Sequence, residues 1–230
     1  MTAHTFTLPD AGTLNYRMYV PESISSGKKV PLVLFLHGAG ERGDDNLKQL
    51  KHGVTNILNF VQSAGDAIVI APQCPADKRW VEVDWNKPTH SMPAEPSLSL
   101  KLVLALLEDV LQKYPVDQNK LYVTGVSMGG YGTWDLIQRR PKLFAAAIPI
   151  CGGGDSALAP MIKNVNVWIF HGGSDSVVPV IRSQDMYQAL KACGGRVQYT
   201  EYPNVDHDSW TRTYANADVL KWMFKQTRHP

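Results

Sequence analysis

A serine between glycines is the residue of this chain best placed to act as a nucleophile. Ser127 is the central residue of Gly125-Val126-Ser127-Met128-Gly129, which follows a β-branched run and precedes a helical pattern. A tight turn from strand to helix needs small residues two positions before and after the serine, because larger side chains would collide with both elements. The turn raises the hydroxyl above the strand end, where the next backbone N–H can stabilise an oxyanion. The sequence therefore predicts a nucleophile elbow at Ser127.

A serine hydroxyl is a poor nucleophile near neutral pH, so Ser127 needs a base and an acid that orients this base. Asp175 follows one predicted strand, and His207 follows the last one. Sites in open α/β sheets form at the C-terminal edge of the strands, where these residues would meet. We therefore expect Ser127, Asp175 and His207 to be nucleophile, acid and base. Asp206 and Asp208 flank the histidine and are expected to point away from its ring.

Small residues also follow the predicted strand at 30–37, in His37-Gly38-Ala39-Gly40-Glu41-Arg42-Gly43. Backbone N–H groups can approach a bound carbonyl only where side chains are small. We expect the N–H groups of Ala39 and Met128 to form an oxyanion hole, with Gly40 as a third donor. Arg42 and Glu41 are candidates for binding a charged substrate group, and a local ion pair between them is the alternative that we favour.

Three tryptophans are candidates for lining a substrate pocket, or for anchoring long loops instead: Trp80, Trp85 and Trp210. Residues 72–96 hold five prolines and no helical pattern, and long connections of this kind are usually functional or mobile. We expect this connection to roof the site. His37 and His171 each precede a glycine at a strand end and are expected to support their loops. No Cys/His pairs at zinc spacing occur, so no metal site is expected.

Short apolar runs alternate with segments of helical period, which is typical of a mostly parallel sheet covered by helices. Strands are predicted at 16–20, 30–37, 67–71, 120–126, 145–151, 165–171 and 196–202. Helices are predicted at 46–60, 98–113, 128–140, 181–192 and 214–226. Residues 152–164 leave too little chain for a helical lid, so an open pocket is expected.

Several motifs together resemble the α/β-hydrolase superfamily. They are the elbow, the loop at 37–43, Ala71-Pro72-Gln73-Cys74-Pro75, Pro149-Ile150-Cys151-Gly152-Gly153-Gly154-Asp155, His171-Gly172-Gly173-Ser174-Asp175 and His207-Asp208-Ser209-Trp210. The chain is most similar to small bacterial esterases of the dienelactone-hydrolase and carboxylesterase type, a group often labelled predicted peptidases, over residues 14–224. The resemblance implies an α/β-hydrolase fold with helices on both faces of the sheet, no sizeable lid and one domain over residues 1–230.

The resemblance implies the same triad of Ser127, Asp175 and His207. It also implies a serine carboxylic-ester hydrolase that forms an acyl-enzyme with short-chain, aryl or carbohydrate-linked esters. A serine peptidase or amidase with the same triad is the first alternative. A non-catalytic ligand receptor on this scaffold is the second. No cofactor is implied. The strand order of the family separates Cys74 from Cys151 by about three strand spacings, beyond disulfide reach, so both are expected to be free thiols.

The composition excludes several classes of partner. The chain has 230 residues, 23 Lys+Arg against 21 Asp+Glu and a formal net charge of +2, without a long basic block. Nucleic acid and anionic membranes are therefore not expected as partners, whereas a small-molecule ester is. No apolar run approaches the ~18 residues that cross a bilayer. The N-terminal residues lack the pattern of a signal peptide, so we expect a cytoplasmic protein unless a leader has been removed. The sequence leaves open whether the protein forms a homo-oligomer.

Overall fold

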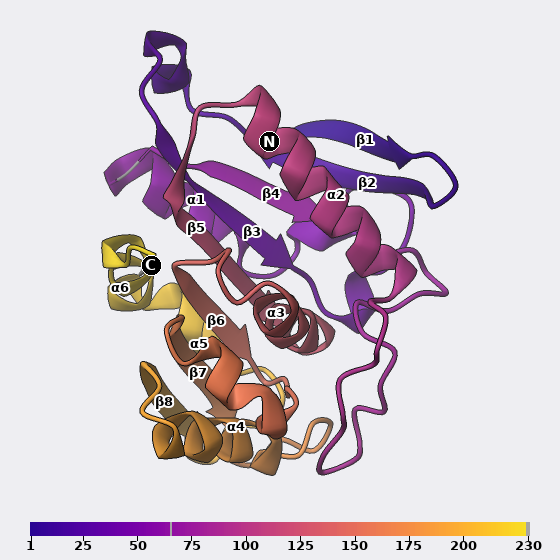
Figure 1. Ribbon diagram of the computed structural model, residues 1–230, viewed down its shortest axis with the longest axis vertical. Coiled ribbons are helices and arrows are strands. Elements are labelled where there is room, and N and C mark those ends of the chain that lie inside the picture. The colour runs from indigo at the N-terminus through magenta and orange to yellow at the C-terminus, as the bar shows by residue number, and fades with distance from the viewer. Residues whose placement is uncertain (65, 229–230) are drawn as a thin grey trace.

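The computed structural model describes residues 1–64 and 66–228, and its core is one eight-stranded sheet (Figure 1). The strand order is β1-β2-β4-β3-β5-β6-β7-β8. The strands are β1 Thr2–Leu8, β2 Gly12–Tyr19, β3 Val30–Leu36, β4 Ile68–Pro72, β5 Val116–Val126, β6 Ala146–Ile150, β7 Asn166–Gly172 and β8 Val197–Tyr202. β2 is antiparallel to β1 and β4, and every other pair of neighbours is parallel. The expected mostly parallel sheet is confirmed.

Helices cover both faces of the sheet (Figure 1). They are α1 Val54–Ala64, α2 Leu98–Lys113, α3 Met128–Arg139, α4 Ile181–Ala192, α5 Trp210–Ala215 and α6 Ala217–Lys225. Because side chains alternate along a strand, Leu32, Leu34 and Leu36 of β3 belong to the core cluster on the face that α2, α3 and α4 cover. Val33 and Phe35 pack on the other face with α1, α5 and α6. Among the described residues, no helix is both long and apolar enough to span a membrane.

β2 and β5 each begin four residues before their predicted starts, and three further differences from the sequence-based prediction have a local reason. β1 was not predicted, because it is an edge strand whose half-exposed residues are mostly polar. The helix predicted at 46–60 begins only at Val54, because Gly53 takes a left-handed φ of 77° that interrupts it. The helix predicted at 214–226 is two helices, because the backbone of Asn216 is extended and its side chain caps α6 at the N–H of Asp218. α2 has the predicted bounds, and Ser97 caps it.

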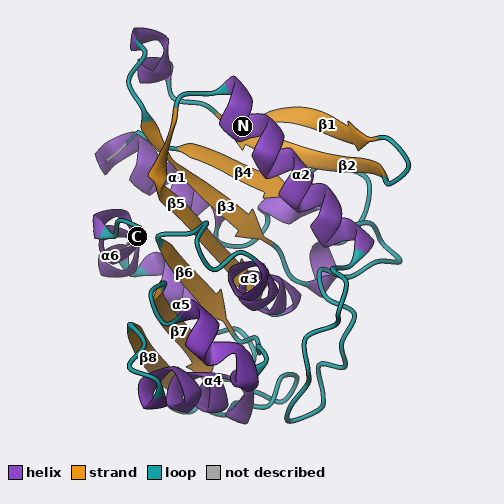
Figure 2. Cartoon of the chain, in the orientation of Figure 1, coloured by secondary structure: helices purple, strands orange, loops and turns teal. Residues whose placement is uncertain are grey.

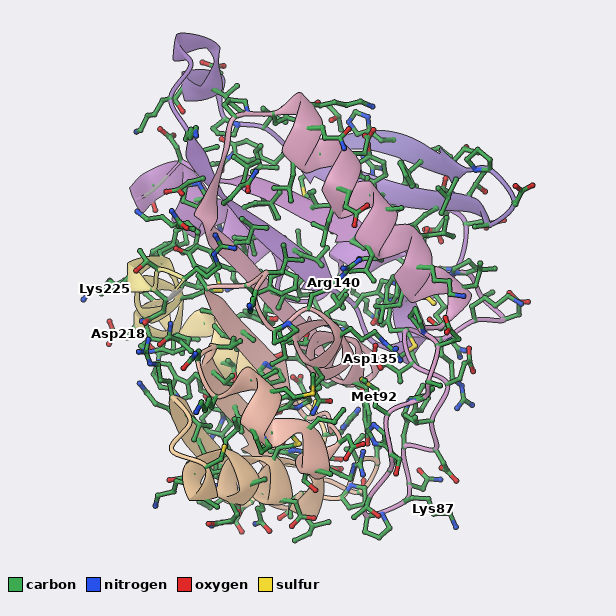
Figure 3. All side chains as sticks on the ribbon, viewed as in Figure 1. Lys87, Met92, Asp135, Arg140, Asp218 and Lys225 are labelled. Carbon is green, nitrogen blue, oxygen red and sulfur yellow. The ribbon has the colours of Figure 1, made fainter. Side chains whose placement is uncertain are left out.

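The connection between β4 and α2 contains neither helix nor strand and is tied to the domain at several points (Figure 2). The Tyr131 hydroxyl donates to the carbonyl of Trp85 at 3.2 Å. The Arg139 guanidinium donates to the carbonyls of Pro93 and Ala94. The N–H of Met92 donates to Asp155 at 2.9 Å. Figure 3 shows Lys87 at the outer end of this loop and Met92 closer to α3.

The turn between β5 and α3 is packed too closely for side chains. A Cβ on Gly129 would lie 1.9 Å from the carbonyl oxygen of Leu36, and a Cβ on Gly125 would lie 2.4 Å from that of Gly129. A Cβ on Gly130 would lie 2.5 Å from the carbonyl oxygen of Ile150. Contacts this short involve backbone, which cannot rotate away. The first turn of α3 is therefore in direct backbone contact with the ends of β3 and β6.

Replacing Gly129 should therefore unfold the turn. We expect Gly129→Ala to lower the free energy of unfolding by about 3 kcal/mol or more, because the added methyl overlaps backbone. Gly40→Ala is the matched control, since nothing lies within 4 Å of its Cβ position, and should change stability by about 0.5 kcal/mol or less. Urea unfolding followed by circular dichroism measures both. Equal midpoints for Gly129→Ala and wild type would contradict this account of the turn.

Candidate active site

Ser127 lies at the turn between β5 and α3 with an unusual backbone conformation. Its φ is 54° and its ψ is −116°. A residue other than glycine with a positive φ is rare and persists only where the surroundings enforce it. Here the Ser127 N–H donates to the carbonyl of Ile150 at 2.9 Å, at the end of β6. The strand, turn and helix expected around Ser127 are present.

The structure brings Ser127, His207 and Asp175 together from three different loops. His207 Nε2 lies 2.8 Å from Ser127 Oγ, and His207 Nδ1 lies 2.8 Å from Asp175 Oδ2. Asp175 follows β7 and His207 follows β8, so neighbouring parallel strands carry the acid and the base. A carboxylate only accepts hydrogen bonds, so the proton of the neutral ring is on Nδ1. Nε2 is then free to accept the proton of the serine hydroxyl.

The Asp175 carboxylate is fully buried and receives donors on both oxygens. Oδ1 accepts from the N–H groups of Val177 at 2.9 Å and Val178 at 2.8 Å. Oδ2 faces the two histidines, His207 and His171. Burial alone would raise the pKa of Asp175, but these hydrogen bonds outweigh it and hold the pKa well below its usual range. The acid therefore stays ionised beside His207.

Sequence reasoning expected His171 to support its loop and missed its contact with Asp175. The ring is fully buried, and Nε2 lies 3.0 Å from the Val178 carbonyl and 3.2 Å from Asp175 Oδ2. Both partners are acceptors, so Nε2 carries a proton. Nδ1 lies 2.7 Å from Ser183 Oγ on α4. The short spacing of four residues between His171 and Asp175 is the feature of the sequence that could have indicated this contact.

The loop after β3 forms a short 3-10 helix, η2 Ala39–Glu41. Ala39 is the first residue of η2 and Met128 the first residue of α3. The N–H groups of first-turn residues have no acceptor within their own helix. Gly38, Ala39 and Gly40 line the same cavity as Ser127. Both predicted oxyanion donors are thus helix-initial N–H groups beside the serine.

His37 supports this loop, as expected. Its Nδ1 donates to the carbonyl of Gly38 at 2.6 Å, and its Nε2 accepts from the N–H of Cys74 at 2.9 Å. The indole N–H of Trp80 donates to the carbonyl of His37 at 3.0 Å. Burial lowers the pKa of His37 to about 4. The ring is therefore neutral at pH 7 and joins β3, the loop after β4 and Trp80.

A cavity of about 330 Å³ opens above Ser127. It is lined by Gly38, Ala39, Gly40, Glu41, His52, Trp85, Val126, Ser127, Val177, His207 and Trp210. Two of the three candidate tryptophans, Trp85 and Trp210, are therefore on its wall. Trp85 comes from the long connection between β4 and α2, so that connection contributes to the cavity wall. That it roofs the site stays a prediction. The Trp210 ring lies edge to face with the His207 ring, with centroids 5.2 Å apart.

Two of the predicted substrate contacts are wrong. Trp80 is fully buried against His37 and does not line the cavity, because its indole serves as an internal anchor. The Arg42 guanidinium donates to the carbonyls of Ala39 and Lys78, so it holds the loop and does not line the cavity either. The alternative ion pair between Arg42 and Glu41 is also not formed. Glu41 lies instead 3.5 Å from His52 Nε2.

His52 is a cavity residue that sequence reasoning missed, since no motif surrounds it. The two rival acids lie as expected: Asp206 accepts from the N–H of Ser176, and Asp208 from that of Thr211. Neither is within hydrogen-bond distance of the His207 ring in the described structure. The catalytic candidates are therefore Ser127, Asp175 and His207 alone.

The cysteines are free thiols, as predicted for Cys74 and Cys151. β4 and β6, which precede them, are three strand spacings apart. Ligand atoms of Cys151, Asp175 and His207 lie within 4.8 Å of one another. Burial raises the pKa of the Cys151 thiol, and the two other groups already bond each other. This set therefore does not fit a resident metal ion.

The mostly parallel sheet, the helices on both faces and the serine turn after β5 define an α/β hydrolase. The chain belongs to the phospholipase/carboxylesterase family, whose sequence pattern matches residues 22–220. It is similar to a thermostable esterase of known structure, with 40% identity and a TM-score of 0.90. That alignment covers 99% of this chain and 63% of the esterase chain. The resemblance stated from the motifs is confirmed.

Two fungal proteins are also similar in sequence. An uncharacterised secreted protein of Arthroderma benhamiae is 26% identical over 96% of this chain and 26% of its own length. A bifunctional acetylxylan esterase/xylanase of Neocallimastix patriciarum is 22% identical over 89% of this chain and 27% of its own length. The chain thus spans about a quarter of these relatives. The cytoplasmic location expected from the sequence stays a prediction.

Burial of neutral His37 predicts a pH-dependent stability. The pKa is about 4 in the folded protein against the usual 6.5, so the unfolded chain binds more protons between these values. Stability should therefore be complete above pH 6.5 and fall by roughly 3 kcal/mol as the pH drops to 4. His37→Gln should reduce the slope by this contribution, while His90, whose pKa burial also lowers to about 4, should keep contributing its own part. The matched control His4→Gln should keep it.

Urea unfolding at half-unit steps from pH 4 to 7 measures these slopes. Parallel curves for wild type and His37→Gln would show that this histidine does not carry the effect.

Proposed function

We propose that the protein is a serine carboxylic-ester hydrolase that works through an acyl-enzyme. The observation that carries the proposal is the pair of 2.8 Å hydrogen bonds that link Ser127, His207 and Asp175 beside the cavity. This geometry matches the nucleophile, base and orienting acid of a serine hydrolase. Membership of the phospholipase/carboxylesterase family supports an ester as the bond that is cleaved.

In the first half of the reaction, Ser127 Oγ attacks the ester carbonyl while His207 Nε2 takes its proton. The resulting imidazolium is stabilised by ionised Asp175, which does not itself take up the proton. The carbonyl oxygen becomes negative and accepts hydrogen bonds from the N–H groups of Ala39 and Met128, with Gly40 as a third donor. The imidazolium then gives its proton to the leaving alkoxide, and the acyl group remains on Ser127.

In the second half, a water molecule takes the place of the alcohol. His207 accepts a proton from this water, which attacks the acyl carbonyl, and the same N–H groups stabilise the second oxyanion. Collapse of that intermediate returns the proton to Ser127 and releases the carboxylic acid. Because one base serves both steps, the orientation of His207 matters twice in each cycle.

The cavity supports small acyl or aryl groups as the bound part of the substrate. Its volume of about 330 Å³ is at the lower end of the range typical of ligand pockets. Trp85 and Trp210 offer aromatic surface against which a ring can pack. The similarity to an acetylxylan esterase/xylanase supports carbohydrate-linked esters in particular. We therefore propose short-chain, aryl or carbohydrate-linked esters.

The triad proposal is tested with 4-nitrophenyl acetate. Wild type should show an initial burst and then turnover, and Ser127→Ala should lose about 10⁴-fold or more in kcat/KM. Because the three residues act as a unit, adding His207→Ala to Ser127→Ala should cost little more. Ser63→Ala, on the exposed side of α1, is the control and should retain wild-type turnover. Full activity of Ser127→Ala, without labelling of wild type by a fluorophosphonate, would refute the proposal.

The substrate size limit is tested at Trp85. Wild-type kcat/KM should fall at least tenfold from the four-carbon to the twelve-carbon 4-nitrophenyl ester, because the longer chain does not fit the cavity. Trp85→Ala should reduce this drop by removing part of the wall, whereas Trp85→Phe should preserve it. Equal rates for both chain lengths with wild type would contradict the proposed limit.

A further inference from the structure

Two cavity residues have no role in the proposed reaction. Among the described residues that line the cavity, Glu41 and His52 are the titratable side chains left over once His207 is assigned as the base. Glu41 follows the oxyanion loop, and His52 precedes α1. Their side chains are 8% and 28% exposed, so both are largely enclosed but can be reached from the cavity. They form a polar patch on an otherwise mostly apolar wall.

The Glu41 carboxylate has hydrogen-bond acceptor positions that its described neighbours do not use. Within the described structure its nearest cationic or ring nitrogen is His52 Nε2, at 3.5 Å, and its side chain makes no closer hydrogen bond. It lies against the oxyanion loop, since a Cβ on Gly38 would come within 3.1 Å of its Oε2. A carboxylate offers about four acceptor positions, and an enclosed one is stable only where donors reach it. The remaining positions can accept hydroxyl groups of a ligand.

The charge of this patch selects against anions. Arg42 is adjacent in sequence, but its guanidinium is committed to the backbone carbonyls of Ala39 and Lys78 and does not line the cavity. A carboxylate or phosphate of a ligand would therefore meet Glu41 without a neutralising arginine. Neutral hydroxyl donors meet no such repulsion.

Trp210 connects this patch with the bond-cleaving end of the cavity. The centroid of its ring lies 5.2 Å from that of the His207 ring and 5.5 Å from that of the His52 ring. A ring-sized group packed on this indole, with its ester at Ser127, would have its far end near His52 and Glu41. Both histidine rings thus contact the same indole.

We propose that Glu41 and His52 form a hydroxyl-recognising subsite, so that the preferred substrate is an uncharged ester whose enclosed part carries a ring hydroxyl. This hydroxyl donates to Glu41, and His52 holds the carboxylate in place. The proposal rests on the esterase activity proposed above and names its substrate class. An aryl hydroxyl on the acyl side and a sugar hydroxyl on the alcohol side share this chemistry.

Matched pairs of esters test the subsite and distinguish the two sources. On the acyl side, methyl 4-hydroxycinnamate is compared with methyl cinnamate. On the alcohol side, the monoacetate of trans-1,2-cyclohexanediol is compared with cyclohexyl acetate. Wild type should prefer the hydroxylated member of at least one pair by about tenfold in kcat/KM, mainly through KM, as expected for a hydrogen bond to a charged group. This comparison requires no variant.

Variants then assign the preference to the two residues. Glu41→Gln and His52→Leu should each bring the ratio of the preferred pair close to one. Glu41→Gln should also improve the relative rate with the methyl ester of 4-carboxycinnamic acid, because the like charge is removed. A purely structural role for Glu41 would not move this charge preference. Glu108→Gln, on exposed α2, is the matched control and should keep the wild-type ratios.

The outcomes separate the two proposals. If wild type is labelled by a fluorophosphonate and cleaves methyl cinnamate and cyclohexyl acetate, but shows ratios near one in both pairs, the subsite is overturned and the esterase proposal stands. Ratios that survive both Glu41→Gln and His52→Leu also overturn the subsite. If wild type cleaves no ester and is not labelled, the esterase proposal fails, and the subsite fails with it.

Discussion

The backbone contact between the first turn of α3 and the ends of β3 and β6 is the constraint on which the rest of the site depends. No side chain fits at Gly125, Gly129 or Gly130, so the chain has to turn sharply at Ser127. That turn holds the serine at a positive φ and places Met128, the first residue of α3, directly after it. The same contact brings the oxyanion loop after β3 alongside. The proposed nucleophile and the proposed oxyanion donors thus share one backbone junction.

The base and acid depend on a second arrangement, the pairing of β7 with β8. These parallel neighbours carry Asp175 and His207 at adjacent ends. The carboxylate is removed from water and surrounded by two backbone N–H groups and two histidines, which compensate for its burial. His171 belongs to the core below and His207 to the cavity above. The carboxylate therefore links the core to the base at the cavity surface.

The convergence of Ser127, Asp175 and His207 could be predicted from the sequence because each follows a strand of one parallel sheet, and parallel strands end at one edge. The alternation of strands and helices likewise predicted the loop at Ala39 and the helices α2, α3 and α4. It missed β1, because a half-exposed edge strand lacks an apolar pattern. It also overextended α1, because the φ of Gly53 depends on packing against Tyr214 and Phe35.

Side-chain roles inside loops were less predictable, for a related reason. Trp80 and Trp85 lie five residues apart in one irregular connection, yet one is an internal anchor and the other a cavity wall. A segment without helix or strand has no regular spacing of apolar residues from which to predict which side chains point inward. Arg42 and Glu41 are adjacent in sequence but have different partners. Arg42 bonds two backbone carbonyls and Glu41 lies beside His52, and no sequence pattern indicates either partner.

Residues 85–94 of the long connection are attached chiefly through their main chain. The carbonyls of Trp85, Pro93 and Ala94 and the N–H of Met92 bond side chains of α3 and of the loop after β6. Within this stretch the His90 side chain, bonded to Arg182, is the exception. Because most of these anchoring side chains lie outside residues 85–94, mutations within that stretch can accumulate without releasing it. Selection can thus reshape the cavity wall, at Trp85 for instance, while the scaffold and the path of the loop are inherited unchanged.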